Sequence, residues 1–180
     1  MSGQGGVVRA FPSLWRKHIL VNRPWLLKSQ DQLWIDYEQS SCHLVKEIEP
    51  TCSCFQGHFP NNPIFPGVLL LELQFQTAAI YALHISEQQQ QQQQLFYLDV
   101  PTLKTCRFRQ LVKPLDKLDI VGKALDSKTN SESLNHPQTR WNFQATISRH
   151  SKIVAESSFV VTIVPQDSLP RTQENRARTL

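Results

Sequence analysis

One long apolar segment dominates the pattern of hydrophobic and polar positions. Residues 67–87 carry hydrophobic side chains nearly all round a helical projection, which predicts a helix that is buried on most faces. The first half of the segment is interrupted by the polar residues Glu72, Gln74, Gln76 and Thr77. A membrane span needs about 20 mainly apolar residues, so we expect a core helix and no membrane span.

Shorter segments rich in β-branched and aromatic residues lie on both sides of this helix and predict strands. Two precede the helix, at residues 33–37 and 42–48. Five follow it, at residues 95–100, 105–111, 119–126, 139–150 and 153–164. A sheet must cover such an apolar helix, so the pattern predicts an α+β fold with an antiparallel sheet.

Polar and compositionally biased segments divide the chain further. We interpret residues 1–21 as an N-terminal extension, 22–165 as a single domain and 166–180 as a mobile tail. Within the domain, the uninterrupted glutamines at 88–94 are interpreted as an insertion, and the polar stretch 127–138 as a long loop.

Charge and cysteine content narrow the classes of function. The net charge of +4 is compatible with an acidic partner, but no dense Lys/Arg cluster interleaved with aromatics indicates nucleic-acid binding. The first ten residues lack the apolar region of a secretory signal, so we expect a cytoplasmic protein with reduced thiols. Cys52, Cys54 and His58 match no common zinc spacing, and we expect no metal.

The candidate chemistry lies where a Gly/Pro-rich loop, residues 55–66, enters the apolar helix. Proline restricts the backbone, so this loop can hold His58 in one place at low entropic cost. Glu72 follows on the helix, and an imidazole with a carboxylate is a suitable pair for acid/base chemistry. Gly67 at the helix start can present a bare backbone N–H to a substrate.

These residues resemble a known family, the 3-hydroxyacyl-[acyl-carrier-protein] dehydratases of the FabZ and FabA group. The matching motif reads Gly57-His58-Phe59-Pro60, Pro63, Pro66-Gly67-Val68 and Glu72, with Gln76 one helical turn later. A Glu at the carboxylate position is similar to the FabZ branch. Residues 22–27 and 104–116 resemble the family more weakly. Leu115 stands where the family's turn has glycine, so its backbone must avoid positive φ or be strained.

The resemblance implies a hot-dog fold, in which a curved antiparallel sheet wraps a long central helix. It also implies a lyase that dehydrates 3-hydroxyacyl-carrier-protein thioesters to trans-2-enoyl thioesters in fatty acid or related polyketide-type biosynthesis. The enzyme would need no cofactor, because the phosphopantetheine of acyl carrier protein carries the substrate. It would act as a homodimer, with a trimer of dimers left open, and the histidine and glutamate of one site would come from different subunits.

Each site residue receives an expected role. His58 removes the C2 proton, Glu72 protonates the departing hydroxyl, and the Gly67 N–H holds the thioester oxygen. We expect Gln76 to orient Glu72 from one turn away, with packing as the alternative. Two aromatic residues, Phe59 and Phe65, are expected to line the acyl tunnel, with simple core packing as the alternative.

Basic residues follow the next strand-like segment. Strand alternation puts Arg107 and Arg109 on one face, where they could meet an acidic carrier protein together with Lys104 and Lys113. A solvated strand face is the alternative. Two other functions remain open: a hot-dog acyl thioesterase, and a non-catalytic acyl-binding or partner subunit.

Overall fold

The computed structural model describes residues 7–9, 26–27, 31–89, 96–99, 101–130 and 138–165. The secondary-structure elements in chain order are β1 (Val7–Arg9), β2 (Gln32–Asp36), β3 (Ser41–Glu47), the short 3₁₀ helix η1 (Ser53–Gln56), α2 (Gly67–Gln89), β4 (Phe96–Leu98), β5 (Thr102–Phe108), β6 (Lys117–Asn130), β7 (Gln138–Arg149) and β8 (Lys152–Pro165). Within these ranges, the long helix α2 and one antiparallel sheet confirm the α+β layout.

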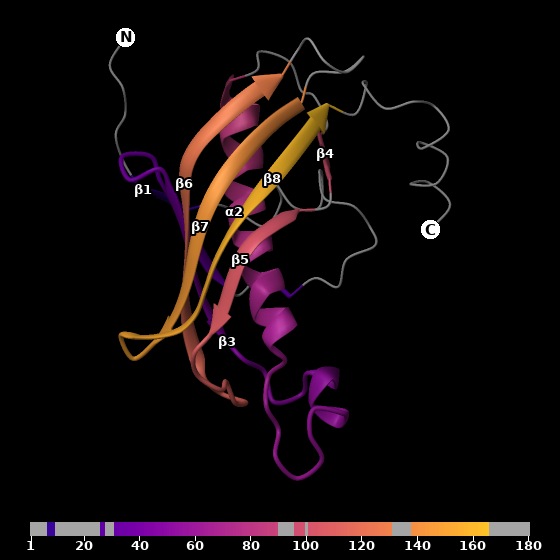
Figure 1. Ribbon diagram of the computed structural model, residues 1–180. Coiled ribbons are helices and arrows are strands. Elements are labelled where there is room, and N and C mark those ends of the chain that lie inside the picture. Colours follow the sequence, from indigo (N-terminus) through magenta and orange to yellow (C-terminus); the bar gives the residue numbers. More distant parts are fainter. Residues whose placement is uncertain are drawn as a thin grey trace.

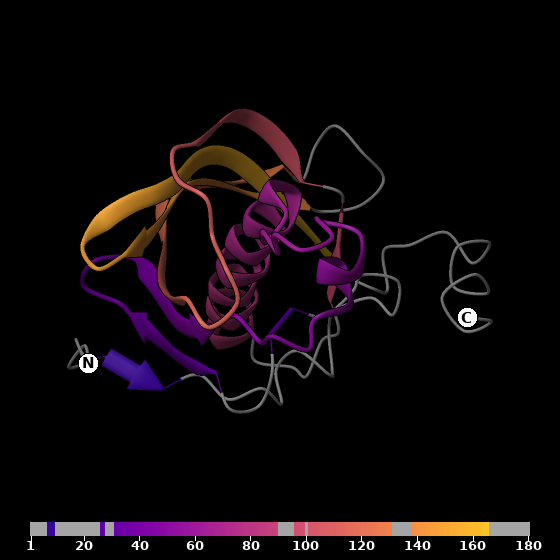
Figure 2. The same ribbon diagram turned by 90° about the horizontal axis from the view of Figure 1, so that it is seen from below.

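The sheet has eight strands in the order β1-β2-β3-β6-β7-β8-β4, and β5 pairs with β8 beside β4. Its strands curve around α2, which runs along the concave side (Figure 1). Seen along the helix, the sheet wraps one side of α2 (Figure 2). This arrangement is the hot-dog fold that the resemblance implied.

Every second side chain in the middle of β7 is buried, and this alternation explains how the sheet covers the helix. Along β7, Trp141, Phe143, Ala145 and Ile147 are buried, while the residues between them are half-buried or exposed. Alternate side chains of a strand point to opposite faces, so the apolar set faces α2. On β6, Gly122 faces the helix, where an added Cβ would lie 3.6 Å from Ala78, an ordinary van der Waals distance.

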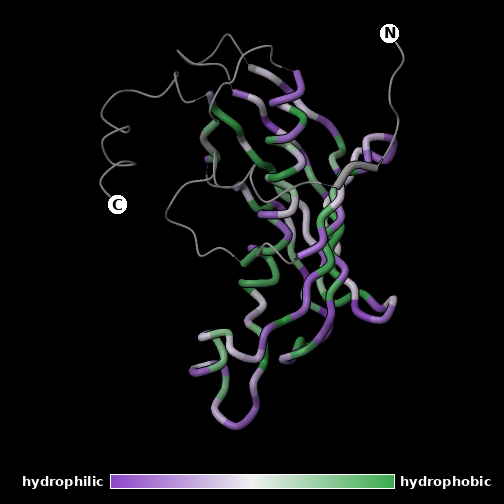
Figure 3. Tube along the Cα trace, turned by 180° about the vertical axis from the view of Figure 1, so that it is seen from behind, coloured by the Kyte–Doolittle hydropathy of each residue, from purple (hydrophilic) through white to green (hydrophobic). Residues whose placement is uncertain are grey.

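The helix is the centre of the core. It carries thirteen buried residues, and its apolar character is visible along the trace in Figure 3. By length and composition α2 would also suit a membrane, but most of its apolar stretch is buried inside the molecule. It therefore behaves as the core helix that the apolar pattern predicted.

Three sequence expectations need correction. The stretch 127–138 is not one loop, because β6 continues to Asn130 and β7 begins at Gln138. The helix extends to Gln89 and so takes up the first two glutamines of the 88–94 run. The strand expected at 105–111 lies three residues earlier, at β5, since the chain leaves the sheet after Phe108.

Three further expectations concern the N-terminal extension, the C-terminal tail and Leu115. Within the expected N-terminal extension, β1 joins the sheet by pairing with β2. The expected tail, 166–180, lies outside the described residues. Leu115, which replaces a turn glycine, does have positive φ, 69°. The conformation that favours glycine is therefore kept here with a side chain that it strains.

Candidate active site

The loop between η1 and α2 closes on itself and carries His58 at its base. The Phe59 and Asn62 backbones exchange hydrogen bonds of 3.2 and 3.0 Å, and the Ile64 N–H donates to the His58 carbonyl at 2.9 Å. At the far side of the loop, the Phe65 N–H donates to the Val112 carbonyl at 2.7 Å. These bonds hold the histidine backbone in place, as the Gly/Pro content of the loop predicted.

The imidazole of His58 is fixed by a backbone carbonyl. Its Nδ1 lies 2.8 Å from the Ile64 oxygen, and its ring stacks on Phe59 with centroids 4.0 Å apart. A carbonyl oxygen only accepts, so Nδ1 must carry the proton in this bond. In the neutral ring Nε2 is then the unprotonated nitrogen. The side chain is thereby arranged as a base.

Glu72 lies on α2, five residues into the helix, and is half-buried. The Gln76 amide donates from Nε2 to Glu72 Oε1 at 2.9 Å. Gln76 is itself oriented, because the Leu26 backbone N–H donates to its Oε1 at 3.2 Å. A backbone donor fixes which end of the amide points to the carboxylate. The expected orientation of Glu72 by Gln76 is present in this geometry.

Gly67 is the first residue of α2 and lies under an aromatic ring. A Cβ at this position would lie 3.2 Å from the Phe108 ring, closer than ordinary contact. The helix hydrogen bonds begin at the Pro66 carbonyl, which accepts from Leu69 and Leu70. Within the described ranges no group accepts from the Gly67 N–H, so this donor at the positive end of the helix is available to a ligand.

The two phenylalanines of the motif have different positions. Phe65 is buried, 4% exposed, and its ring lies 6.1 Å from that of Phe55. Phe59 is 48% exposed and stacks on the catalytic candidate His58. Phe65 thus packs in the core next to the loop, while Phe59 presents its ring to the surface. Their expected role in lining an acyl tunnel stays a prediction.

His58 and Glu72 are held by separate groups. Among the described residues, the imidazole contacts the Ile64 carbonyl and the Phe59 ring, and no hydrogen bond or ion pair joins it to Glu72. The imidazole on the loop and the carboxylate on the helix are therefore not paired with each other within one chain. Their catalytic roles stay predictions.

The basic residues of the expected carrier-protein surface share one face of the sheet. Arg107 lies opposite Glu156 on β8, and the Arg109 guanidinium bonds to that same carboxylate at 2.5 Å. Lys104 would face the other way in a regular strand, but a bulge between Leu103 and Thr105 turns it outward.

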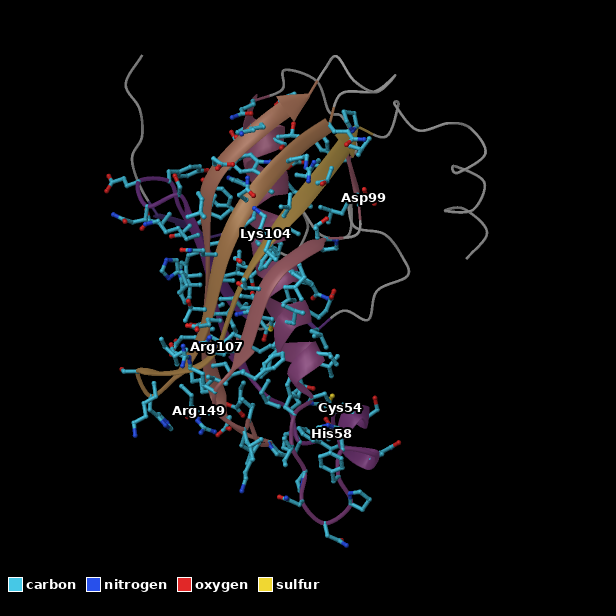
Figure 4. All side chains as sticks on the ribbon, viewed as in Figure 1. Cys54, His58, Asp99, Lys104, Arg107 and Arg149 are labelled. Carbon is cyan, nitrogen blue, oxygen red and sulfur yellow. The ribbon has the colours of Figure 1, made fainter. Side chains whose placement is uncertain are left out.

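This bulge lets the Lys104 ammonium donate to Asn142 at 2.6 Å. Lys113 is exposed in the turn that follows β5. Figure 4 places Arg107 toward the end of the molecule that carries His58, with Lys104 farther along β5. Carrier-protein contact by these residues stays a prediction.

Sequence reasoning missed three neighbours of the site. Leu26 acts through its backbone N–H, which no residue pattern reveals. The Phe108 ring over Gly67 depends on how β5 crosses the helix start. Arg149 bonds to Asp116 and to the Leu111 carbonyl, and so ties the turn after β5 to the β7–β8 hairpin. The weak resemblance of residues 104–116 to the family was the one sequence signal near Phe108.

Comparison with known proteins gives a consistent result. The family model described as ApeI-like, ApeI dehydratase, matches residues 34–153. The chain is 32% identical to the 3-hydroxyacyl-[acyl-carrier-protein] dehydratase FabZ of Granulibacter bethesdensis over 67% of this chain and 64% of that protein. It is 32% identical to the FabZ of Methylobacterium radiotolerans over 73% of this chain and 76% of that protein.

A solved structure supports the fold alone. The fluoroacetyl-CoA thioesterase FlK superposes with a TM-score of 0.51, over 78% of this chain and 94% of that one. The two sequences are only 6% identical, so the likeness extends to the fold and not to the reaction.

Proposed function

The chain belongs to the ApeI-like family of dehydratases, and from that membership we propose that it is a hydro-lyase acting on 3-hydroxyacyl-carrier-protein thioesters. The product is the trans-2-enoyl thioester, and the setting is fatty acid or related biosynthesis in the cytoplasm. The observation that carries the proposal is the state of His58, whose Nδ1 faces a carbonyl so that Nε2 can accept a proton.

The residues present account for each need of the reaction. His58 Nε2 takes the C2 proton, and the electron pair moves toward the thioester oxygen. The Gly67 N–H, at the positive end of α2, holds the oxygen as charge develops there. Glu72 then donates a proton to the C3 hydroxyl, which leaves as water while the C2–C3 double bond forms.

Gln76 orients the Glu72 carboxylate for that step. Its Nε2 donates to Oε1 at 2.9 Å, which holds the carboxylate in one orientation on the helix. The Leu26 N–H keeps the Gln76 amide from flipping. Gln76 is therefore a positioning residue, which acts on the substrate through the carboxylate.

We also propose a homodimer in which His58 of one protomer meets Glu72 of the other. Strand β5 supports this arrangement, because within the described residues it pairs only with β8 and leaves one edge open. Large apolar residues are exposed beside that edge and beside the site, namely Phe59, Val68, Leu103, Phe108 and Leu111. A second copy placed against this edge would cover them.

The partner that delivers the substrate would be an acidic carrier protein with a phosphopantetheine phosphate. Arg107 and Lys113 are exposed and have no carboxylate partner in the described ranges, so they can meet such a surface. Arg109 is already paired with Glu156 and contributes less positive charge.

A substrate panel tests the proposed function. Purified protein is incubated with 3-hydroxyacyl-carrier-protein thioesters of several chain lengths, and the products are identified by mass and by enoyl absorbance. We expect loss of water and no free thiol. His58→Ala and Glu72→Gln should each lower turnover by about 10²–10⁴-fold with an unchanged circular dichroism spectrum.

His43→Gln is the matched control, since His43 lies on β3 and bonds to Ser41 away from the loop. Full activity of either active-site variant would overturn the proposal. Release of free thiol without water loss would favour a thioesterase instead.

A further inference from the structure

Two thiols lie side by side at the base of the loop that carries His58. Cys52 immediately precedes η1 and Cys54 lies within it, and their sulfur atoms are 2.8 Å apart. Both cysteines are free and half-buried. A disulfide has a sulfur–sulfur distance of about 2.05 Å, so closure needs a movement of less than about 1 Å.

We propose that Cys52 and Cys54 form a redox-active dithiol, which hydrogen peroxide converts to an intramolecular disulfide. One thiolate attacks a peroxide oxygen, the O–O bond breaks, and a sulfenic acid and a hydroxide ion result. The hydroxide takes up the proton that the thiol had released and becomes water. The second sulfur attacks the sulfenic sulfur, the S–O bond breaks, and a second water leaves as the S–S bond forms. The two thiols lose two electrons and the peroxide gains them.

Cys52 and Cys54 take different steps of this reaction. Burial, followed by the hydrogen bond shared with Cys52, raises the pKa of the Cys54 thiol to about 12. Cys54 is therefore protonated near neutral pH, and we assign the first attack to Cys52. Cys54 closes the disulfide, and its proton goes to the departing hydroxide.

The other two cysteines lack such a partner and serve as internal controls. Cys42 is fully buried on β3, where burial raises the pKa of its thiol. Cys106 lies on β5, opposite Ser157. Neither has another sulfur within hydrogen-bonding distance in the described part of the chain.

The position of the pair connects oxidation to the active site. Cys54 is followed by Phe55, whose ring contacts Phe65 at the entry to α2. Figure 4 shows Cys54 close to His58 at the same end of the molecule. Closing the disulfide constrains the turn from which the histidine loop leaves, so we expect the oxidised protein to turn over more slowly, by about threefold or more.

Peptide mapping tests the site without reference to activity. Trypsin cuts after Lys46 and next after Lys104, so Cys52 and Cys54 share one peptide that contains no other cysteine. The protein is treated with hydrogen peroxide, alkylated with N-ethylmaleimide, and digested. We expect this peptide to be unlabelled and lighter by two hydrogens, and to take two labels after prior reduction with dithiothreitol.

Variants give the contrasting outcomes. Cys106→Ser should form the same disulfide, while Cys54→Ser should yield a Cys52 sulfenic or sulfinic acid in its place. Two labels on the wild-type peptide after peroxide, or disulfides to Cys42 or Cys106, would overturn the proposal. Equal turnover before and after disulfide formation would overturn the link to the active site.

Discussion

The two flanks of the sheet differ in strand pairing and in the burial of their side chains. Along β7 buried residues alternate regularly and face α2, β8 is buried at most positions after Ile153, and β6, β7 and β8 each have neighbours on both sides. On β5, six of seven residues are exposed and one edge has no partner in the described ranges. We call the first region the closed flank and the second, β5 with the adjoining helix start, the open flank.

The difference indicates where stability and function reside. The closed flank is complete within one chain and holds the fold together. The open flank contains Gly67 under the Phe108 ring, and it exposes apolar side chains next to the loop of His58. Such a surface becomes buried only when a second molecule covers it. The candidate catalytic residues therefore lie at or beside the flank whose apolar surface one chain leaves exposed.

The largest expected effect is on the closed flank. Phe143 is 1% exposed and contacts the rings of Tyr81 and Phe159. Phe143→Ala should lower the free energy of unfolding by about 3–5 kcal/mol, because it removes buried apolar surface and leaves a cavity. Urea denaturation followed by circular dichroism measures this loss. A loss of less than about 1 kcal/mol in the free energy of unfolding would contradict the claim that this flank stabilises the fold.

A charge introduced on the open flank should weaken dimerisation and leave the stability of the single chain largely unchanged. Leu103 is 44% exposed on β5, and Leu103→Glu should weaken dimerisation at least tenfold, because it would bury a carboxylate in the interface. Sedimentation equilibrium measures the dissociation constant. Leu125→Glu is the matched control, since Leu125 is 53% exposed on β6, on the closed flank. Equal weakening by both variants would remove the distinction between the flanks.

Adding a single methyl group at a glycine on each flank tests the same distinction. Gly67→Ala should lower kcat/KM about tenfold, because the added Cβ would lie 3.2 Å from the Phe108 ring, and the ring or the helix start must move to make room. Gly122→Ala should be nearly neutral, since its Cβ would make an ordinary 3.6 Å contact with Ala78. Steady-state kinetics on both variants checks the pair. A neutral Gly67→Ala would argue against the role of its N–H.

The smallest expected effect concerns the carrier protein. Arg107→Ala should raise KM about threefold for a carrier-protein thioester and leave kcat unchanged, because an exposed charge at an interface rim guides association. The same variant should have unchanged kinetics with the corresponding coenzyme A thioester. An equal change with both substrates would indicate a general effect on the site.

The sequence predicted the architecture well where patterns are local and regular. The apolar helix, the α+β class and most strands follow from periodicity, and the Gly/Pro loop with His58 follows from residue type. Strand bounds were less accurate, because β6 and β7 carry polar residues past the point where apolar alternation stops. The bulge that turns Lys104 outward leaves no mark in the alternation of residues.

Tertiary contacts explain the remaining differences in the site. The Leu26 N–H reaches Gln76 across fifty positions of sequence, and the Phe108 ring reaches Gly67 because β5 crosses the helix start. Such contacts depend on how elements pack, which no local pattern encodes. The positive φ of Leu115 shows the same limit, since a branched side chain gives no local reason for that conformation.

The central claim is that His58 and Glu72 of one active site come from different protomers. It is tested by mixing His58→Ala and Glu72→Gln proteins, each inactive alone, under conditions that exchange subunits. Random pairing makes half of the dimers mixed, and each mixed dimer would hold one intact site, so activity should rise to about a quarter of wild type. If the mixture stays inactive while mass spectrometry shows mixed dimers, both residues serve one site within a single chain and the claim is wrong.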